Sequence, residues 1–142
     1  TYTDNYVKEL KELSADDPRI IFTGLQKGRA LEELFSNAYL FVQPSESEGL
    51  SIALLEAMAH GVPVLVSDIP ENLEAMGEAG FTFVNNDKND LRVKMEHLLM
   101  EPQYTQARAK EGLERVAREY DWEVITSKIL EIYKESMAGK RG

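Results

Sequence analysis

The chain has 142 residues, of which 43% are hydrophobic, so it is long enough to bury the core of one ordinary globular domain. It contains no cysteine, which excludes disulfides, thiolate metal sites and a cysteine nucleophile, and which fits a reducing compartment. Its 16 basic and 25 acidic residues give a net charge of -9, and no basic cluster is large enough to make nucleic acid a leading partner.

Short segments rich in branched and aromatic residues predict strands, and helical patterns separate them. The expected strands are 19–24, 39–45, 63–68 and 80–84. The expected helices between them are 4–13, 30–38, 51–60 and a short helix that begins after Pro70. Alternation of this kind predicts an α/β fold, a Rossmann-like parallel sheet with helices on both faces.

After residue 85 the pattern predicts helices only. They cover about 88–100, 103–118 and 122–137. We therefore expect a single domain over 1–142 with a helical C-terminal part over 86–142. No apolar run approaches the roughly 18 residues of a membrane-spanning helix, and no signal-peptide pattern opens the chain. A soluble, cytoplasmic protein is expected.

The stretch PSESEGLSIALLEAM, residues 44–58, joins an expected strand to an expected helix. Ligands of parallel sheets bind at the carboxyl ends of the strands, where loops lead into helix N-termini. If the helix begins near Ser51, the backbone N–H groups of Gly49, Leu50 and Ser51 are free donors at the positive end of the helix dipole. Gly49 leaves room for a phosphate, and Ser51 can cap the helix or donate to that phosphate. We predict an anion site here.

Two carboxylates flank this anion site, Glu48 before it and Glu56 after it. They cannot bind phosphate, so they must accept hydrogen bonds from another group, and sugar hydroxyls are the obvious donors. Eight helical residues span about 12 Å, comparable to the reach from one sugar across a diphosphate to another. Glu56 would then accept from a ribose and Glu48 from a transferred sugar.

A simpler interpretation is that Glu46 and Glu48 are solvated turn residues and that Glu56 lies on the exposed stripe of an amphipathic helix. The neighbours of Glu56 one turn away are Ile52, Ala53, Ala59 and His60. This face is mostly apolar and small, which weakens the simpler interpretation without removing it.

The same stretch resembles the signature of retaining GT-B glycosyltransferases, and most closely the large family 4, also called group 1. The resemblance rests on Pro44, Ser45, Glu48, Gly49, Leu54 or Leu55, Glu56, Ala57, Met58, Ala59, Gly61, Pro63 and Val64. The hallmark of this family is two glutamates separated by seven residues, which Glu48 and Glu56 match. Ser51 departs from a glycine common at its position, so we expect a tighter site and one more hydrogen bond to the donor.

The resemblance implies that the chain is the C-terminal, nucleotide-sugar-binding half of a two-domain enzyme. It assigns hydroxyls of the transferred sugar to Glu48, the catalytic residue, and ribose hydroxyls to Glu56. Donor-binding roles also fall to Gly49, Leu50 and Ser51, through backbone N–H groups, and to Gly24, Leu25 and Gln26, against the base. Such enzymes transfer a sugar to a hydroxyl acceptor with retention, and no metal is expected because a helix terminus and basic side chains stabilise the leaving diphosphate.

Several parts of the family pattern have no match in these residues. An upstream Arg and Lys that meet the diphosphate are missing, and Lys27 and Arg29 are poor substitutes. The N-terminal acceptor domain and the first strands of the donor domain are also missing. We therefore expect a fragment with little transfer activity alone, whose uncovered sheet leads to oligomers or instability. The resemblance leaves open a peripheral membrane association of the longer protein.

Other residues are expected to be structural. His60 ends a helix, where a cation is ordinary, and His97 is expected on the surface, so a zinc site is not predicted. Trp122 fits a packing anchor at a helix start. Asp68 and Glu74 flank a turn and a short helix, and capping is their expected role.

Two alternative functions stay open at this point. A sugar-nucleotide epimerase or phosphorylase of related fold would use a similar donor cleft. A non-catalytic nucleotide-binding or assembly module would not depend on Glu48.

Overall fold

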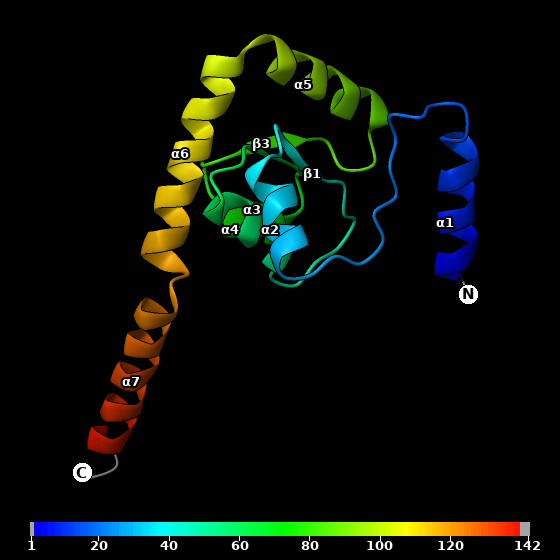
Figure 1. Ribbon diagram of the computed structural model, residues 1–142. Helices are drawn as coiled ribbons and strands as arrows, with labels where there is room; N and C mark the ends of the chain where they lie inside the picture. The colour runs from blue at the N-terminus through cyan, green and yellow to red at the C-terminus, as the bar shows by residue number, and fades with distance from the viewer. Residues whose placement is uncertain (1, 140–142) are drawn as a thin grey trace. The chain divides into compact units, whose positions relative to one another are not determined.

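The structure of the protein is a computed structural model, which describes residues 2–139 and the side chains of residues 5–138 (Figure 1). The chain forms two compact units, residues 1–31 and residues 32–142. The expectation of one domain over 1–142 stays a prediction.

The first unit contains helix α1, Tyr2–Leu13, which agrees with the predicted helix 4–13. The turn after α1 is closed by Asp17, whose carboxylate oxygens lie 2.8 Å and 2.7 Å from Nε and Nη2 of Arg19. Further along, the ammonium nitrogen of Lys11 lies 5.9 Å from the ring centroid of Phe22. The contact between Lys11 and Phe22 therefore ties the residues that follow the turn back to α1.

The predicted strand 19–24 is wrong. Residues 20–24 form neither a helix nor a strand and pair with no strand in the described part of the chain, and Ile21 is 77% exposed. A strand exists only where a second backbone pairs with it. The described residues offer segment 19–24 no such neighbour.

The second unit contains a sheet of three parallel strands in the order β1-β2-β3. The strands are β1 Phe41–Gln43, β2 Val64–Ser67 and β3 Phe81–Phe83. In the register of the sheet, Val42 lies opposite Leu65, and Leu65 lies opposite Phe81. All three strands lie within the predicted ranges 39–45, 63–68 and 80–84.

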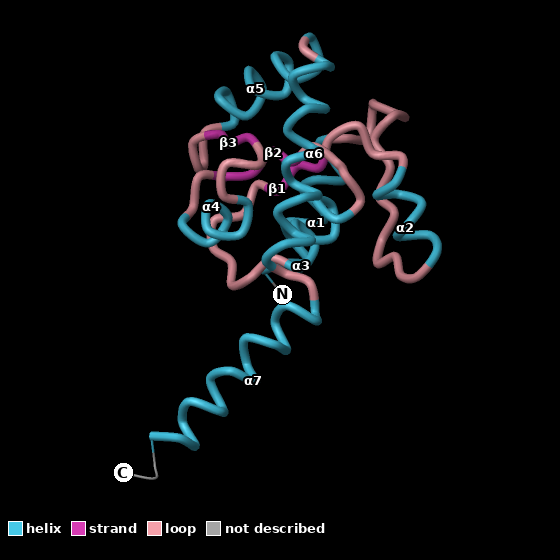
Figure 2. The backbone as a smooth tube through the Cα atoms, turned by 90° about the vertical axis from the view of Figure 1, so that its left-hand side faces the viewer, coloured by secondary structure: helices cyan, strands magenta, loops and turns pink. Residues whose placement is uncertain are grey.

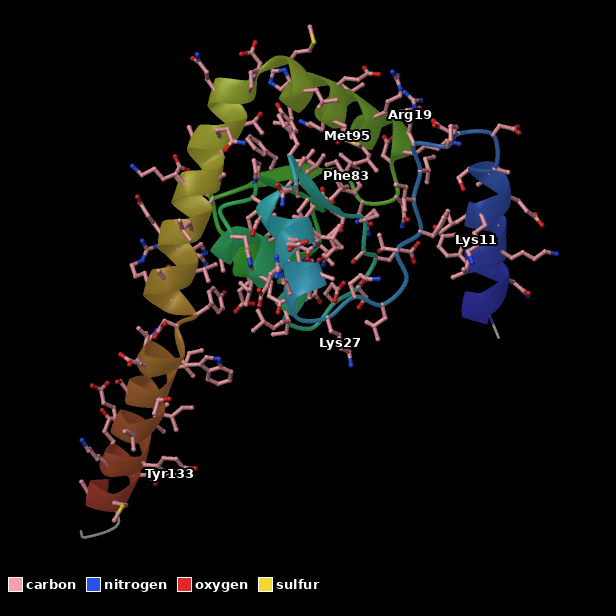
Figure 3. All side chains as sticks on the ribbon, in the orientation of Figure 1. Lys11, Arg19, Lys27, Phe83, Met95 and Tyr133 are labelled. Carbon is pink, nitrogen blue, oxygen red and sulfur yellow. The ribbon has the colours of Figure 1, made fainter. Side chains whose placement is uncertain are left out.

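Helices cover both faces of this sheet. Helices α3, Ile52–Ala59, and α4, Pro70–Met76, lie on one face, and α5, Lys88–Met100, lies on the other (Figures 1 and 2). On the α5 side, Leu65 packs with Phe83 and Leu98, and Figure 3 shows Phe83 between the sheet and α5. Since side chains alternate along a strand, Val64 faces the other helices. The predicted α/β class is confirmed.

Close packing on the α4 side depends on glycine. A Cβ at Gly80 would lie 2.6 Å from Cγ2 of Val64 and would also overlap the side chain of Met76. The chain therefore enters β3 beneath α4 only because position 80 has no side chain.

The remaining helices are α2, Arg29–Ser36, α6, Pro102–Glu119, and α7, Trp122–Gly139. Their bounds agree with the predictions to within two residues. Helix α6 packs against α3 and α5, and a Cβ at Gly112 would lie 3.3 Å from the carbonyl oxygen of Ala79. From residue 84 to residue 139 the described chain contains helices and no strands, as predicted for 86–142.

Trp122 is not the packing anchor that we predicted. It is 81% exposed, because α7 packs mainly against α6. Tyr133 further along α7 projects from the helix in the same way (Figure 3). Within the described residues, α7 therefore exposes an apolar stripe formed by Trp122, Ile129, Ile132 and Tyr133.

Candidate functional site

The candidate site lies at the carboxyl end of β1. β1 ends at Gln43, residues 44–51 form a loop, and α3 begins at Ile52 with Ser51 as its N-cap. Ser51 Oγ accepts a hydrogen bond from the backbone N–H of Leu54 at 3.3 Å. The predicted junction of strand, loop and helix N-terminus is confirmed, with the helix starting where the anion-site argument needs it.

Glu48 is held in the loop by one of its two carboxylate oxygens. Its Oε1 accepts from Ser45 Oγ at 2.6 Å and from Gln43 Nε2 at 3.1 Å. Within the described residues no group donates to Oε2. The side chain is half-buried, so Glu48 is oriented by the protein and keeps one oxygen for another hydrogen-bond donor. This geometry differs from that of a solvated turn residue.

The backbone N–H groups of Gly49, Leu50 and Ser51 follow directly. No acceptor for these three N–H groups is found in the part of the chain that the structure describes. A Cβ at Gly49 would meet nothing within 4 Å, and the φ of Gly49 does not lie in the left-handed region. The space beside this backbone is therefore open to a ligand, and free donors at a helix N-terminus suit an anion.

The hydroxyl of Ser51 points into the protein. Ser51 Oγ donates to Gln43 Oε1 at 2.8 Å, and the residue is 8% exposed. Because a hydroxyl carries one proton, this proton is not directed to a ligand. The structure therefore does not support the expected extra hydrogen bond from the Ser51 hydroxyl to the donor. Ser51 acts as the N-cap of α3 instead.

Sequence reasoning missed two buried amides of the site, Gln43 and Asn72. Gln43 ends an otherwise apolar strand, and Asn72 lies on α4 and is fully buried. Asn72 Nδ2 donates to the carbonyl oxygen and to Oγ of Ser67, both at 3.1 Å. The one signal that could have found Gln43 is its polar side chain directly before Pro44 in the run YLFVQPS.

Glu56 lies on the exposed side of α3, away from the hydrogen bonds of Glu48. With Leu50 and Trp122 it lines a mostly apolar pocket of about 370 Å³ between α3 and the junction of α6 and α7. The estimate of a 12 Å helical span from Glu48 to Glu56 was wrong in its premise, because only residues 52–56 of that interval are helical.

Gly24, Leu25 and Gln26 belong to the first unit. Gly24 has a φ of +63°, which favours glycine, and Gln26 Nε2 donates to the carbonyl oxygen of Thr23. Leu25 is 84% exposed. Their expected contact with a nucleotide base stays a prediction.

A group of arginines lies at the C-terminal end of α4. Arg115 donates through Nε to the carbonyl oxygen of Ala75 at 3.0 Å and through Nη2 to that of Glu74 at 2.9 Å, so it satisfies the last carbonyls of the helix. Arg108 pairs with Glu111, which holds the pKa of the arginine above its usual value. Both arginines have structural partners and do not supply the basic pair of the family pattern.

The two histidines behave as expected. The Nδ1 atom of His60 lies 2.8 Å from the carbonyl oxygen of Glu56, and its ring stacks on Phe35 with 5.4 Å between centroids. His97 is exposed on α5. Among the described residues no group of three or more His, Asp or Glu side chains could hold a metal ion. The absence of a metal from the mechanism stays a prediction.

Asp68 accepts from the backbone N–H of Asn85 at 2.8 Å. It does not cap α4 as expected, because the N-cap position of that helix is Ile69 and no side chain caps it. No helix in the described part of the chain is both long and apolar enough to cross a membrane.

The geometry can be compared with known proteins. Residues 2–101 match the family model described as "Glycosyl transferases group 1". The chain is 34% identical over 131 residues to the sulfoquinovosyl transferase SQD2 of Arabidopsis thaliana. The aligned region covers 87% of this chain and 25% of SQD2. The chain is 29% identical over 133 residues to the O-antigen chain mannosyltransferase B of Escherichia coli, covering 94% and 35%. The chain thus spans only about a quarter to a third of these relatives.

Solved structures show the same fold. The sucrose-phosphate synthase of Thermosynechococcus elongatus superposes with a TM-score of 0.84 at 26% identity, covering 95% of this chain and 34% of that one. HepE of Anabaena in complex with UDP superposes with a TM-score of 0.84 at 22% identity, covering 93% and 37%. The fold is therefore that of a fragment of GT-B glycosyltransferases. Together with the family match over residues 2–101, this shows that the chain belongs to the group 1 glycosyl transferases.

Proposed function

We propose that this chain is the donor-binding part of a retaining glycosyltransferase and binds a nucleotide diphosphate sugar. The observation that supports this most directly is the state of Glu48. One of its oxygens is bonded to Ser45 and Gln43, the other has no described partner, and three free backbone N–H groups follow it. A fixed acceptor beside free donors suits a ligand that carries both hydroxyls and phosphates.

In this proposal the transferred sugar donates a hydroxyl hydrogen bond to Glu48, the catalytic residue of the site. The diphosphate accepts from the backbone N–H groups of residues 49–51, where the positive end of the α3 dipole adds to the attraction. Negative charge grows on the diphosphate as its bond to the sugar breaks. Donors already oriented toward that charge stabilise the transition state without reorganising.

The remaining donor contacts are proposed from the family resemblance. Glu56 accepts from the ribose hydroxyls, and Gly24, Leu25 and Gln26 lie against the base. In the family resemblance, the domain that binds the acceptor and the basic pair lie outside these 142 residues. We therefore expect these residues alone to bind the donor and to transfer little sugar. The retaining outcome is proposed for the longer enzyme. The absence of a metal cofactor, the cytoplasmic location and a peripheral membrane contact of the longer protein stay predictions.

The test is calorimetric titration of the folded chain with UDP-, GDP- and ADP-sugars. UDP-glucose is a natural first choice because it is the ligand of a HepE structure. Glu48→Gln should weaken binding of the nucleotide sugar about tenfold, since it removes a hydrogen bond to a charged acceptor. The same substitution should leave binding of the free nucleotide diphosphate nearly unchanged.

Glu56→Gln should weaken binding of the nucleotide sugar and of the free nucleotide diphosphate to the same extent, because both ligands contain the ribose. The matched control is Glu46→Gln, which changes an exposed carboxylate of the same loop and should alter neither affinity. A folded chain that binds none of the three donors would contradict the proposal and favour an assembly module.

A further inference from the structure

The side chain of Gln43 joins the two functional parts of the site. Its Nε2 donates to Glu48 Oε1 at 3.1 Å, and its Oε1 accepts from Ser51 Oγ at 2.8 Å. One amide therefore contacts both the acid of the loop and the N-cap of α3. Gln43 is 8% exposed, and shielded hydrogen bonds are costly to lose because the groups left behind stay buried.

Asn72 determines the direction in which this amide points. Asn72 Nδ2 donates to the carbonyl oxygen of Ser67, which can only accept, so Asn72 Oδ1 must face Gln43. Gln43 then turns its own NH₂ group toward Asn72 Oδ1, at 3.4 Å, and toward Glu48. The carbonyl of Gln43 is left for the hydroxyl of Ser51. The carbonyl oxygen of Ser67 on β2 thus determines which group donates and which accepts in the hydrogen bonds from Asn72 to Gln43 and from Gln43 to Glu48.

The helix that carries Asn72 is anchored from α6. Helix α4 has only seven residues, and Arg115 binds its last carbonyls at Glu74 and Ala75. The guanidinium lies so close to Gly77 that a Cβ there would be 2.8 Å from Arg115 Cζ. Arg115 therefore restricts movement of α4 and with it the position of Asn72.

We propose that Gln43 and Asn72 are positioning residues of the donor site, which orient Glu48 and the start of α3 without touching the donor. The inference rests on the proposed function. The hydrogen bond from Gln43 engages Oε1 of Glu48, so Oε2 is the oxygen presented to the sugar. The same amide turns the hydroxyl of Ser51 inward, which leaves the loop N–H groups as the donors to the diphosphate.

The first experiment compares Gln43→Met with wild type in titrations against UDP-glucose and against UDP, or against the best-bound nucleotide sugar and its free diphosphate. Methionine keeps the volume and removes the amide. Affinity for the nucleotide sugar should fall about tenfold, and affinity for the free diphosphate should fall less. The control is Gln106→Met, the same change at an exposed position of α6. Equal affinities in Gln43→Met and wild type, or equal losses for both ligands, would overturn the proposal.

A second variant separates positioning from packing. In Gln43→Glu, a protonated carboxyl has one acceptor and one donor and can replace the amide between Ser51 and Glu48. An ionised carboxylate at 43 would instead repel Glu48. Binding of the nucleotide sugar by Gln43→Glu, measured relative to wild type at each pH, should therefore recover as the pH falls from 8 to 5. A ratio that stays constant over this range would argue against the proposal.

A third measurement needs no ligand and therefore tests the amide network separately from the proposed function. If the folded wild type binds no donor, the proposed function is wrong, and this measurement still shows whether Gln43 and Asn72 hold Glu48. The side-chain NH₂ protons of Gln43 and Asn72 should exchange with solvent much more slowly than those of Gln106, and Asn72→Leu should speed the exchange at Gln43 and at the backbone N–H of Leu54. Exchange at Gln43 as fast as at Gln106 in wild type would show that the amide network does not hold Glu48.

Discussion

Two loops of the molecule follow apolar segments, and they are held in different ways. The loop at 44–51 follows a paired strand and is held by the side chains of Gln43 on β1 and Ser67 on β2, each of which is hydrogen-bonded in turn to Asn72 on α4. The loop at 25–28 follows the unpaired residues 20–24. Among the described residues its polar contacts are local, such as the hydrogen bond from Gln26 Nε2 to the carbonyl oxygen of Thr23.

The difference shows what a binding loop requires. Contacts within three residues settle the conformation of a loop but not its position relative to distant groups. The hydrogen bond from Ser67 Oγ on β2 to the carbonyl oxygen of Ser45, 22 positions away in the sequence, places the loop at 44–51 against the sheet. The donor-binding proposal is therefore stronger for Glu48 and residues 49–51 than for Gly24, Leu25 and Gln26.

The largest effect should come from removing a core side chain beneath the first loop. Leu65→Ala deletes a fully buried side chain of β2 and should lower the free energy of unfolding by about 2–5 kcal/mol. Leu25→Ala, the same change in the second loop, should lower it by less than about 0.5 kcal/mol because Leu25 is exposed. Urea denaturation measures both. Similar losses in the two variants would break the comparison.

A smaller effect is expected from the N-cap. Ser51→Ala removes the bond to Leu54 N–H and the bond to Gln43, and should cost about 1–2 kcal/mol. Ser14→Ala removes an exposed bond to the carbonyl oxygen of Lys11 in the first unit and should cost less than about 0.5 kcal/mol. Thermal unfolding followed by circular dichroism provides the measurement. A cost for Ser51→Ala no greater than for Ser14→Ala would contradict the assigned cap.

The unpaired segment bears on self-association, which the uncovered sheet predicts. Ile21 is exposed in a segment that pairs with no strand of the described chain, and unpaired apolar segments can add to sheet edges of other molecules. Ile21→Lys should reduce the fraction of dimer and larger species in sedimentation velocity. Ile132→Lys on α7, an exposed apolar residue outside the segment, is the control. A larger reduction in Ile132→Lys would show that the chains associate through α7 rather than through segment 20–24. A monomeric wild type would contradict the prediction of self-association.

The smallest effect concerns the turn of the first unit. The hydrogen bond from Arg19 holds the pKa of Asp17 below its ordinary value of 3.8. A depressed pKa contributes stability that is present above pH 3.8 and is lost as the pH falls through the lower, folded value. Asp17→Asn should therefore slightly lower the urea midpoint at pH 6, and this difference from wild type should shrink as the pH is lowered below 3.8, with Asp16→Asn as the control. Equal midpoints at pH 6 would show that the exposed pair contributes nothing measurable.

The helices could be predicted closely because their signals are local. Pro70 stands at the first position of α4, and Asp87 caps α5 by accepting from the N–H groups of Asn89 and Asp90. A helix closes its hydrogen bonds within four residues, so a short window of sequence contains the information that starts and ends it.

The site was partly predictable for the same reason. Glu48, Gly49 and Ser51 lie together in one stretch of sequence, whose pattern indicated an anion site and resembled a known family. The orientation of Glu48 could not be predicted, because it depends on an amide that lies directly before the motif and on another that lies on α4. Nothing in the local pattern around Asn72 indicates that its side chain reaches β2 and Gln43.

The sequence by itself determined the helices, the parallel β1-β2-β3 core and the family. Only the tertiary structure decided that residues 20–24 form no strand and that Gln43 and Asn72 hold the acid of the site. The physical reason is the same in both cases. A strand and a buried amide are stable only when distant groups complete their hydrogen bonds, and neither the composition nor the spacing of a segment says whether those groups will be there.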